Sequence, residues 1–154
     1  MTSTIRGLST LALVAALAGA SFVAARFWQG QQDVFERTAA PSDCVLQNGP
    51  CEQLVDGAPV RLAITPETIP LMQTLTLEVD VGDREPSQVA VDIRGLNMDM
   101  GLNRTVLALS EEGGWRGETI LPVCSQRRME WEAAVQIETN KRFEVPFLFS
   151  TVRP

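Results

Sequence analysis

From residue 58 to the carboxyl end, apolar and polar residues alternate along the chain in short runs. Successive side chains of a β-strand point to opposite faces, so this alternation predicts strands with one buried face and one face in contact with water. Turn-forming residues separate the runs, which cover residues 60–65, 74–81, 88–93, 104–110, 115–122, 130–138 and 143–151. The pattern predicts an all-β fold for residues 58–154, a seven-stranded immunoglobulin-like β-sandwich.

Every second residue of these strands is expected to face the core. The strands with the clearest alternation place inward Val60, Leu62, Ile64, Leu75, Leu77, Val79, Val81, Val89, Val91, Ile93, Trp131, Ala133, Val135, Ile137, Phe143, Val145, Phe147 and Phe149. On the opposite face of 130–138, the polar residues Glu130, Glu132, Gln136 and Glu138 are expected to form a solvated outer surface. Pro146 has no N–H to donate, so its strand should lie at a sheet edge or leave that position unbonded.

An uncharged apolar segment, residues 7–25, lies between Arg6 and Arg26 near the amino end. At 1.5 Å per residue it is long enough to cross a bilayer, and it predicts one N-terminal transmembrane helix within residues 1–28. Arg26 and Trp28 favour a retained anchor, whereas the small residues at 18–20 fit a cleaved signal segment. In either case we expect a bacterial inner (cytoplasmic) membrane protein, single-pass if the segment is retained, with its C-terminal domain in the periplasm.

Residues 29–57 are polar and contain scattered turn residues, which predicts a stalk. Within this stalk Cys44 and Cys51 bracket an Asn-Gly-Pro reversal, so a disulfide-stapled loop is expected in an oxidising compartment. A dithiol for metal binding or disulfide exchange is the alternative, although the spacing is not C-x-x-C. Cys124 has no evident partner, and it is either a small buried hydrophobe or a functional thiol.

The charge and the residue types of the chain exclude several classes of function. The formal charge is −6, and residues 27–154 carry 11 basic and 19 acidic residues, a net charge of −8. This balance disfavours nucleic acid and is compatible with cations or a basic protein partner. Histidine is absent from the sequence, which excludes Ser-His-Asp and Cys-His nucleophiles and His-bearing zinc or blue-copper centres. Tyrosine is absent too, which removes another general acid. We therefore expect no enzyme activity and no small-molecule substrate.

Sulfur-containing residues form the candidate site. Met98 and Met100 are one residue apart, so on an extended loop both side chains point to the same side. Cys124 and Met129 flank a turn that could meet this loop at the same end of the sandwich. Thioether and thiolate are ligands that Cu(I) prefers, and Trp131 shares the strand parity of Met129 and could cover the ion. The alternative is that all five residues are packing residues of the core.

The order of motifs along the chain resembles that of the YtkA-like or FixH-like extracytoplasmic β-sandwich domains. The matching residues are Met98, Met100 and Gly101 of a Met-Gly loop, then Gly114, Trp115 and Gly117, then Leu121 and Pro122, then Trp131 and Val135. The similarity covers about 90 residues, from Pro59 to Arg153. It implies a membrane-tethered sandwich that serves copper handling or the assembly of haem-copper oxidases. The stapled segment and Cys124 depart from the family pattern.

These observations lead to one expected function and one alternative. The first is a membrane-anchored extracytoplasmic Cu(I)-binding protein that takes part in copper handling or haem-copper oxidase assembly. Its expected partners are the membrane and a haem-copper oxidase or a copper chaperone. The alternative is an accessory or assembly subunit of a respiratory membrane complex, which acts as an interaction domain without metal.

Overall fold

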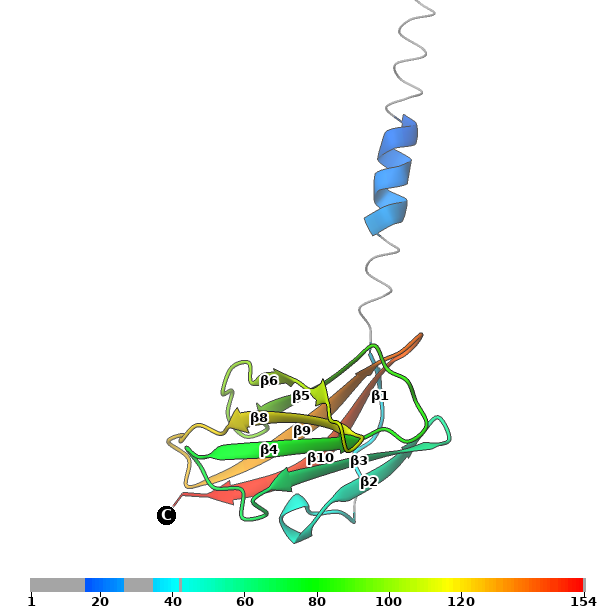
Figure 1. The fold of residues 1–154 in the computed structure, drawn as a ribbon. Coiled ribbons are helices and arrows are strands. Elements are labelled where there is room, and N and C mark those ends of the chain that lie inside the picture. Colours follow the sequence, from blue (N-terminus) through cyan, green and yellow to red (C-terminus); the bar gives the residue numbers. More distant parts are fainter. Residues whose placement is uncertain (1–15, 27–34, 42, 154) are drawn as a thin grey trace, which may run out of the picture. The chain divides into compact units, whose positions relative to one another are not determined.

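The computed structural model describes residues 16–26, 35–41 and 43–153 of the chain (Figure 1). The chain divides into two units, Met1–Val34 and Phe35–Pro154. In the first unit, residues 16–26 are helical. Among the described residues, no helix is long and apolar enough to cross a membrane. Residues 1–15 and 27–28 of the predicted anchor lie outside the described residues.

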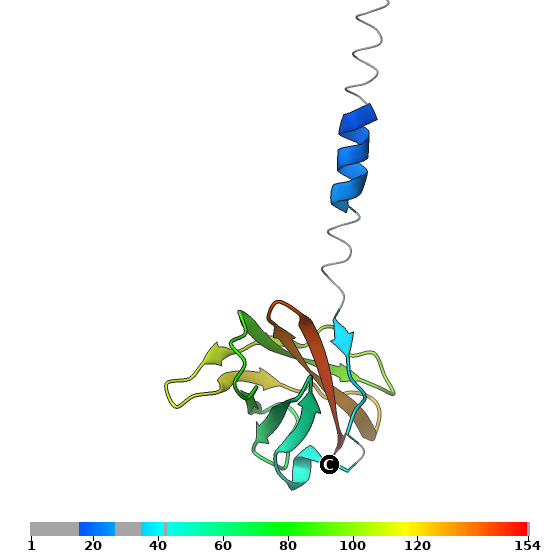
Figure 2. The same cartoon turned by 90° about the vertical axis from the view of Figure 1, so that its right-hand side faces the viewer.

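The second unit is a β-sandwich of two five-stranded sheets, which form its two layers (Figures 1 and 2). The first sheet has the strand order β1-β10-β9-β5-β6 and the second β2-β3-β4-β8-β7. The elements are β1 (Glu36–Arg37), the 3₁₀ helix η1 (Leu46–Asn48), β2 (Cys51–Val55), β3 (Ala58–Thr65), β4 (Thr74–Asp80), β5 (Gln88–Gly95), β6 (Arg104–Val106), β7 (Ala108–Leu109), β8 (Trp115–Ile120), β9 (Arg128–Glu138) and β10 (Arg142–Val152). The predicted all-β sandwich is therefore correct, and the predicted number of strands is not.

One predicted strand is divided between the two sheets. Within residues 104–110, β6 pairs with β5 in the first sheet and β7 pairs with β8 in the second. Leu107 lies between them, is only 4% exposed, and donates its N–H to the carbonyl of Val89 at 2.9 Å. Gly117 makes room for this crossing, because a Cβ there would lie 2.6 Å from Leu107 Cδ2. The chain thus changes sheets at a buried leucine.

Two strands, β1 and β2, fall inside the segment that the sequence predicted to be a stalk. β2 and β3 form a hairpin through Asp56 and Gly57, whose φ angles are 48° and 80°. Two consecutive positive φ angles match the twist of a two-residue hairpin, and Asp-Gly is a preferred sequence for it. The Asp-Gly pair was thus a hairpin signal, and the polarity of the surrounding segment concealed it.

The sandwich core consists of the side chains that the alternation placed inward. All 18 of them are buried, each with 4% or less of its surface exposed. Trp131 stacks against Phe149 with ring centroids 6.2 Å apart, and its Nε1–H donates to Thr151 Oγ1 at 2.8 Å. The indole is therefore packed between the sheets with its polar atom bonded.

The predicted disulfide joins Cys44 to Cys51, with their Cα atoms 5.6 Å apart. Between the two cysteines, η1 places Leu46 in the core at 1% exposure. The next residue, Gln47, donates from its side-chain amide to the carbonyl of Ser150 on β10. The stapled loop therefore closes one border of the sandwich.

β10 lies next to the edge strand β1, and Pro146 lies beyond the two residues that β1 pairs. β1 pairs with β10 only at Phe143 and Glu144, in a parallel ladder of two residues. On its other side, β10 pairs with β9 along its whole length, with Pro146 opposite Ala134. Beyond Glu144 the outer side of β10 has no paired strand in the described part of the sheet, so a residue without an N–H is tolerated there.

Candidate functional site

A loop of residues 96–103 lies against the start of β9 at one end of the sandwich. The N–H of Leu96 donates to the carbonyl of Glu130 at 2.8 Å. Asn97 donates from Nδ2 to the carbonyl of Arg128 at 3.0 Å and accepts the N–H of Glu130 at Oδ1 at 3.2 Å. The Asn97 side-chain amide thus bonds to the backbone of β9 as the N–H and C=O groups of a neighbouring strand would. These bonds fasten the loop that carries Met98 and Met100 to the strand that carries Met129.

Met100 and Met129 meet above Gly95, the last residue of β5. A Cβ built on Gly95 would lie 3.0 Å from Met129 Cε and 3.1 Å from Met100 Cγ. It would also lie 2.2 Å from the carbonyl oxygen of Met98, closer than any real side chain allows. Glycine is therefore required for the loop to fold back over the strand and bring the two thioethers together.

Met98 brings the segment after β8 into the same cluster. Its Sδ accepts the hydroxyl of Ser125 at 3.8 Å, and Ser125 directly follows Cys124. The Cys124 thiol donates to the carbonyl of Gln126 at 3.6 Å and is free in the described part of the chain. The four sulfur residues of the sequence prediction thus lie at one end of the sandwich, contributed by three segments.

The four residues differ in depth. Met129 is 2% exposed, whereas Met98, Met100 and Cys124 are half-buried and pack against the core from outside. Trp131 lies two residues further along β9, inside the core. Met129 is thus the buried member of the four, and the other three side chains are partly open to solvent. We call these four residues the sulfur cluster.

The described residues contain no group of three His, Cys, Asp or Glu side chains that could hold a metal ion. That result concerns imidazole, thiol and carboxylate donors, and it leaves thioethers aside. The donors of the sulfur cluster are three thioethers and one thiol, which are soft ligands. They fit Cu(I), and they are poor ligands for the hard ions Mg²⁺ and Ca²⁺.

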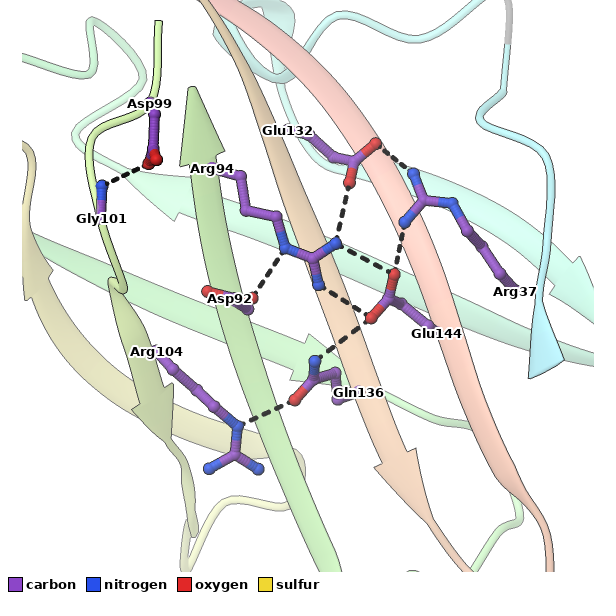
Figure 3. Close-up of polar contacts among 9 residues, drawn as sticks. All are labelled: Arg37, Asp92, Arg94, Asp99, Gly101, Arg104, Glu132, Gln136 and Glu144. Atoms are coloured by element: carbon purple, nitrogen blue, oxygen red, sulfur yellow. Dashed lines mark hydrogen bonds and ion pairs between the residues drawn. The ribbon is translucent and has the colours of Figure 1, made fainter. Parts of the chain in front are cut away.

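The outer face of the first sheet corrects one prediction. Glu132 and Gln136 were expected in a solvated surface, but they are only 5% and 8% exposed. They belong to a polar network that spans five strands (Figure 3), whose members are Arg37, Asp92, Arg94, Arg104, Glu132, Gln136 and Glu144. Alternation alone places these side chains outward, and it does not reveal that long arginines lie across the carboxylates and cover them.

Arg94 is the centre of this network. Its Nε lies 2.7 Å from Asp92 Oδ2, and its Nη2 lies 2.8 Å from Glu144 Oε2. Glu132 is within 3.7 Å of the same guanidinium and also pairs with Arg37 from β1. Arg37 contacts Glu144 as well, so it holds the two-residue strand β1 to the sheet. The network thus ties the first residues of the sandwich to β5, β9 and β10.

The ionic contacts shift the pKa values of Glu144, Arg94 and Arg37 in the directions that favour their charged forms. Burial alone raises the pKa of Glu144, but hydrogen bonds from Arg94 and Gln136 outweigh it and hold this pKa below its ordinary value. The bond to Glu144 raises the pKa of Arg94, and the bond to Glu132 raises that of Arg37. Glu144 and both arginines are therefore charged at neutral pH.

Sequence reasoning missed two groups of residues that shape this end of the molecule. Asn97 and Gly95 position the sulfur cluster without contributing a donor atom, and an Asn and a Gly at the end of a predicted strand were their only signal. Asp92 and Arg94 are opposite charges on the outward face of one strand, a pattern that indicates an ion pair.

Compared with known proteins, the chain matches no family model, and no curated protein or solved structure was found to be similar to it. The likeness to the YtkA-like and FixH-like domains therefore stays a prediction from sequence motifs.

Proposed function

We propose that this protein is a membrane-anchored, extracytoplasmic Cu(I) carrier that takes part in copper handling or haem-copper oxidase assembly. The observation that supports the proposal is the meeting of Met98, Met100, Cys124 and Met129 at one end of the sandwich. A predicted apolar anchor and a disulfide fit a location outside the cytoplasm. The ion is cargo, and the protein is a carrier without a catalytic step.

The donor set selects the metal. Cu(I) is a soft d¹⁰ ion that binds thioether and thiolate in preference to carboxylate. The chain has no histidine, so imidazole cannot tune the site toward Cu(II) or toward a His-bearing zinc site. The half-exposed Met98, Met100 and Cys124 give the ion a route in and out, as a carrier requires. Met129 closes the site from the core side.

Anaerobic competition for Cu(I) against a chromogenic chelator tests this proposal on the full-length protein in a mild detergent. The wild-type protein is expected to withdraw Cu(I) from the chelator, and a Met98→Leu/Met100→Leu variant is expected to lose most of this capacity. Leucine keeps the apolar volume, so the fold should survive. A Leu96→Ser/Leu102→Ser variant changes the same loop without removing sulfur and serves as the control. Wild-type protein that fails to compete, or a methionine variant that competes equally well, would contradict the proposal.

A second candidate is the interaction domain without metal. Leu96 and Leu102, which are 55% and 85% exposed, lie on either side of Met98 and Met100 in the loop 96–103, which we call the methionine loop. Exposed apolar side chains on a loop favour protein contacts. Affinity isolation from solubilised membranes separates the two functions. A stoichiometric complex that survives the methionine substitutions and is lost with Leu96→Ser/Leu102→Ser would favour the interaction domain.

A further inference from the structure

A shallow depression of about 650 Å³ lies where β5 runs into the loop 96–103. Its lining combines charged and apolar side chains, among them Asp92, Arg94, Asn97, Met98, Asp99 and Leu102. Figure 3 shows the loop at Asp99 and Gly101 beside the Asp92 and Arg94 end of the polar network. The depression therefore joins the network on the outer face of the sheet to the methionine loop.

The polar network lacks one donor at this end. Three buried carboxylates, Asp92, Glu132 and Glu144, are paired with the two arginines Arg37 and Arg94. Asp92 is only 7% exposed, and its Oδ2 accepts from Arg94, while its Oδ1 is buried with no hydrogen-bond partner among the described residues. In Figure 3 one Asp92 oxygen points away from Arg94. A buried acceptor without a donor costs about 1–3 kcal/mol, so it calls for an explanation.

Arg104 does not supply this donor. It lies directly opposite Asp92 in the ladder between β5 and β6. Its Nε nevertheless donates to Gln136 Oε1 at 2.8 Å, and no contact with Asp92 is recorded among the described residues. Arg104 thus balances the third carboxylate of the network in formal charge, whereas the lining of the depression, with Asp92, Asp99 and Arg94, carries −1. That charge favours a cation.

The lining of the depression indicates which kind of cation fits. The described residues offer no group of three acidic, thiol or imidazole side chains for a bare metal ion. Asp99 adds a second carboxylate, whose Oδ1 accepts the N–H of Gly101 at 2.9 Å. Met98 and Leu102 supply apolar surface, and Leu102 is 85% exposed. Two carboxylates beside apolar side chains match a cationic head on an aliphatic stem.

We propose that this depression receives an arginine or lysine side chain of a basic partner protein. Its charged head lies between Asp92 and Asp99, and its stem lies against Met98 and Leu102. The net charge of −8 on residues 27–154 attracts such a partner over longer distances. Met98 also belongs to the sulfur cluster, so a partner docked here covers that end of the sandwich. The proposal rests on Asp92 and does not require bound copper.

The test uses the full-length, ¹⁵N-labelled protein in detergent micelles without copper. N-acetyl-arginine methylamide is the probe, and the citrulline analogue, which has nearly the same shape without the charge, is its control. We expect saturable shifts of the Gly95, Gly101 and Leu102 amide signals with the arginine probe and an affinity at least about tenfold weaker for citrulline, the loss expected for one charge-assisted hydrogen bond. A lysine counterpart should shift the same signals.

Two variants test the assignment. Asp92→Asn keeps the acceptor for Arg94 and turns the free oxygen into a donor, so arginine binding should weaken about tenfold or more. Asp83→Asn removes the same charge from an exposed carboxylate outside the lining and should bind like the wild type. If Asp92→Asn alters the whole spectrum, Leu102→Ser replaces it as the test, because this exposed side chain leaves the fold intact. It should weaken arginine binding about threefold through the lost apolar contact.

Three results with the arginine probe, its citrulline control and the variants would overturn the proposal. They are the lack of saturable shifts with the arginine probe, equal shifts with citrulline, and unchanged arginine affinity in the variant under test. Ammonium chloride that saturates the same signals at the same affinity would show that any small cation suffices, which also contradicts a side-chain site. Because copper is absent throughout, these outcomes are independent of the Cu(I) titration.

Discussion

Gly95→Ala is the substitution that should damage the sulfur cluster most directly without removing a sulfur atom. The new Cβ would lie 2.2 Å from the carbonyl oxygen of Met98, where ordinary contacts begin at 3.4 Å. The loop backbone must therefore retreat by more than 1 Å, and the retreat strains the Asn97 bonds to β9. Overpacking of this kind typically costs about 1–3 kcal/mol, and a backbone clash belongs near the upper end.

Urea unfolding measures this loss of stability through a lower midpoint at constant slope. Chelator competition by the same variant should show Cu(I) binding weakened in parallel, because Met98 and Met100 move with the loop. Gly117→Ala is the matched control, since its Cβ would meet the flexible Leu107 side chain at 2.6 Å in another part of the sandwich. It should reduce stability and leave copper affinity unchanged. A Gly95→Ala protein with wild-type stability and copper affinity would refute the reasoning.

Three other predictions concern the polar network and the disulfide. Arg37→Gln removes one partner from Glu132 and Glu144, and we expect a loss of about 1–2 kcal/mol, reduced by the partial exposure of Arg37, with faster amide exchange in β1 measured by mass spectrometry. Because the pKa of Glu144 lies below 4.5 in the folded state, its stabilising contribution is complete above that pH and is lost as the pH falls through the folded value. Urea midpoints should therefore drop on acidification below about pH 4.5, and a Glu144→Gln variant should show a smaller drop. An equal drop of the urea midpoint in the wild type and the variant would contradict this. Replacing both Cys44 and Cys51 by serine should cost about 2–3 kcal/mol for the short closed loop, measured as a lower melting temperature that reductant no longer changes.

Alternation of apolar and polar residues located the strands well because one face of each sheet is buried. The inward side chains of β3, β4, β5, β9 and β10 follow a strict period of two, and every one of them lies in the core. The Cys44 to Cys51 disulfide was also predictable, since a tight reversal separates the two cysteines. These features depend on local sequence alone.

Features that depend on contacts between distant segments were not predictable in the same way. The crossing at Leu107 needs the space that Gly117 leaves on another strand. The burial of Glu132 needs Arg94 and Arg37 from β5 and β1 to lie across it. A pattern of period two says which way a side chain points, and it cannot say what else covers that face.

The candidate site was predictable in part for the same reason. The proximity of the two methionines follows from their spacing, and the meeting of Met100 with Met129 depends on the Asn97 bonds and on Gly95. The depression beside Asp92 had no signal in the sequence. It depends on how the loop 96–103 lies beside β5 and on an Asp92 oxygen that no described residue bonds.

X-ray absorption spectroscopy of the Cu(I)-loaded, full-length protein tests the central claim most directly, because it identifies the atoms bound to the metal. We predict a first shell of sulfur atoms only, and a smaller shell in a Cys124→Ser variant. Bound copper with a nitrogen or oxygen shell, or a spectrum that Cys124→Ser and Met98→Leu/Met100→Leu both leave unchanged, would contradict the sulfur cluster as the metal site.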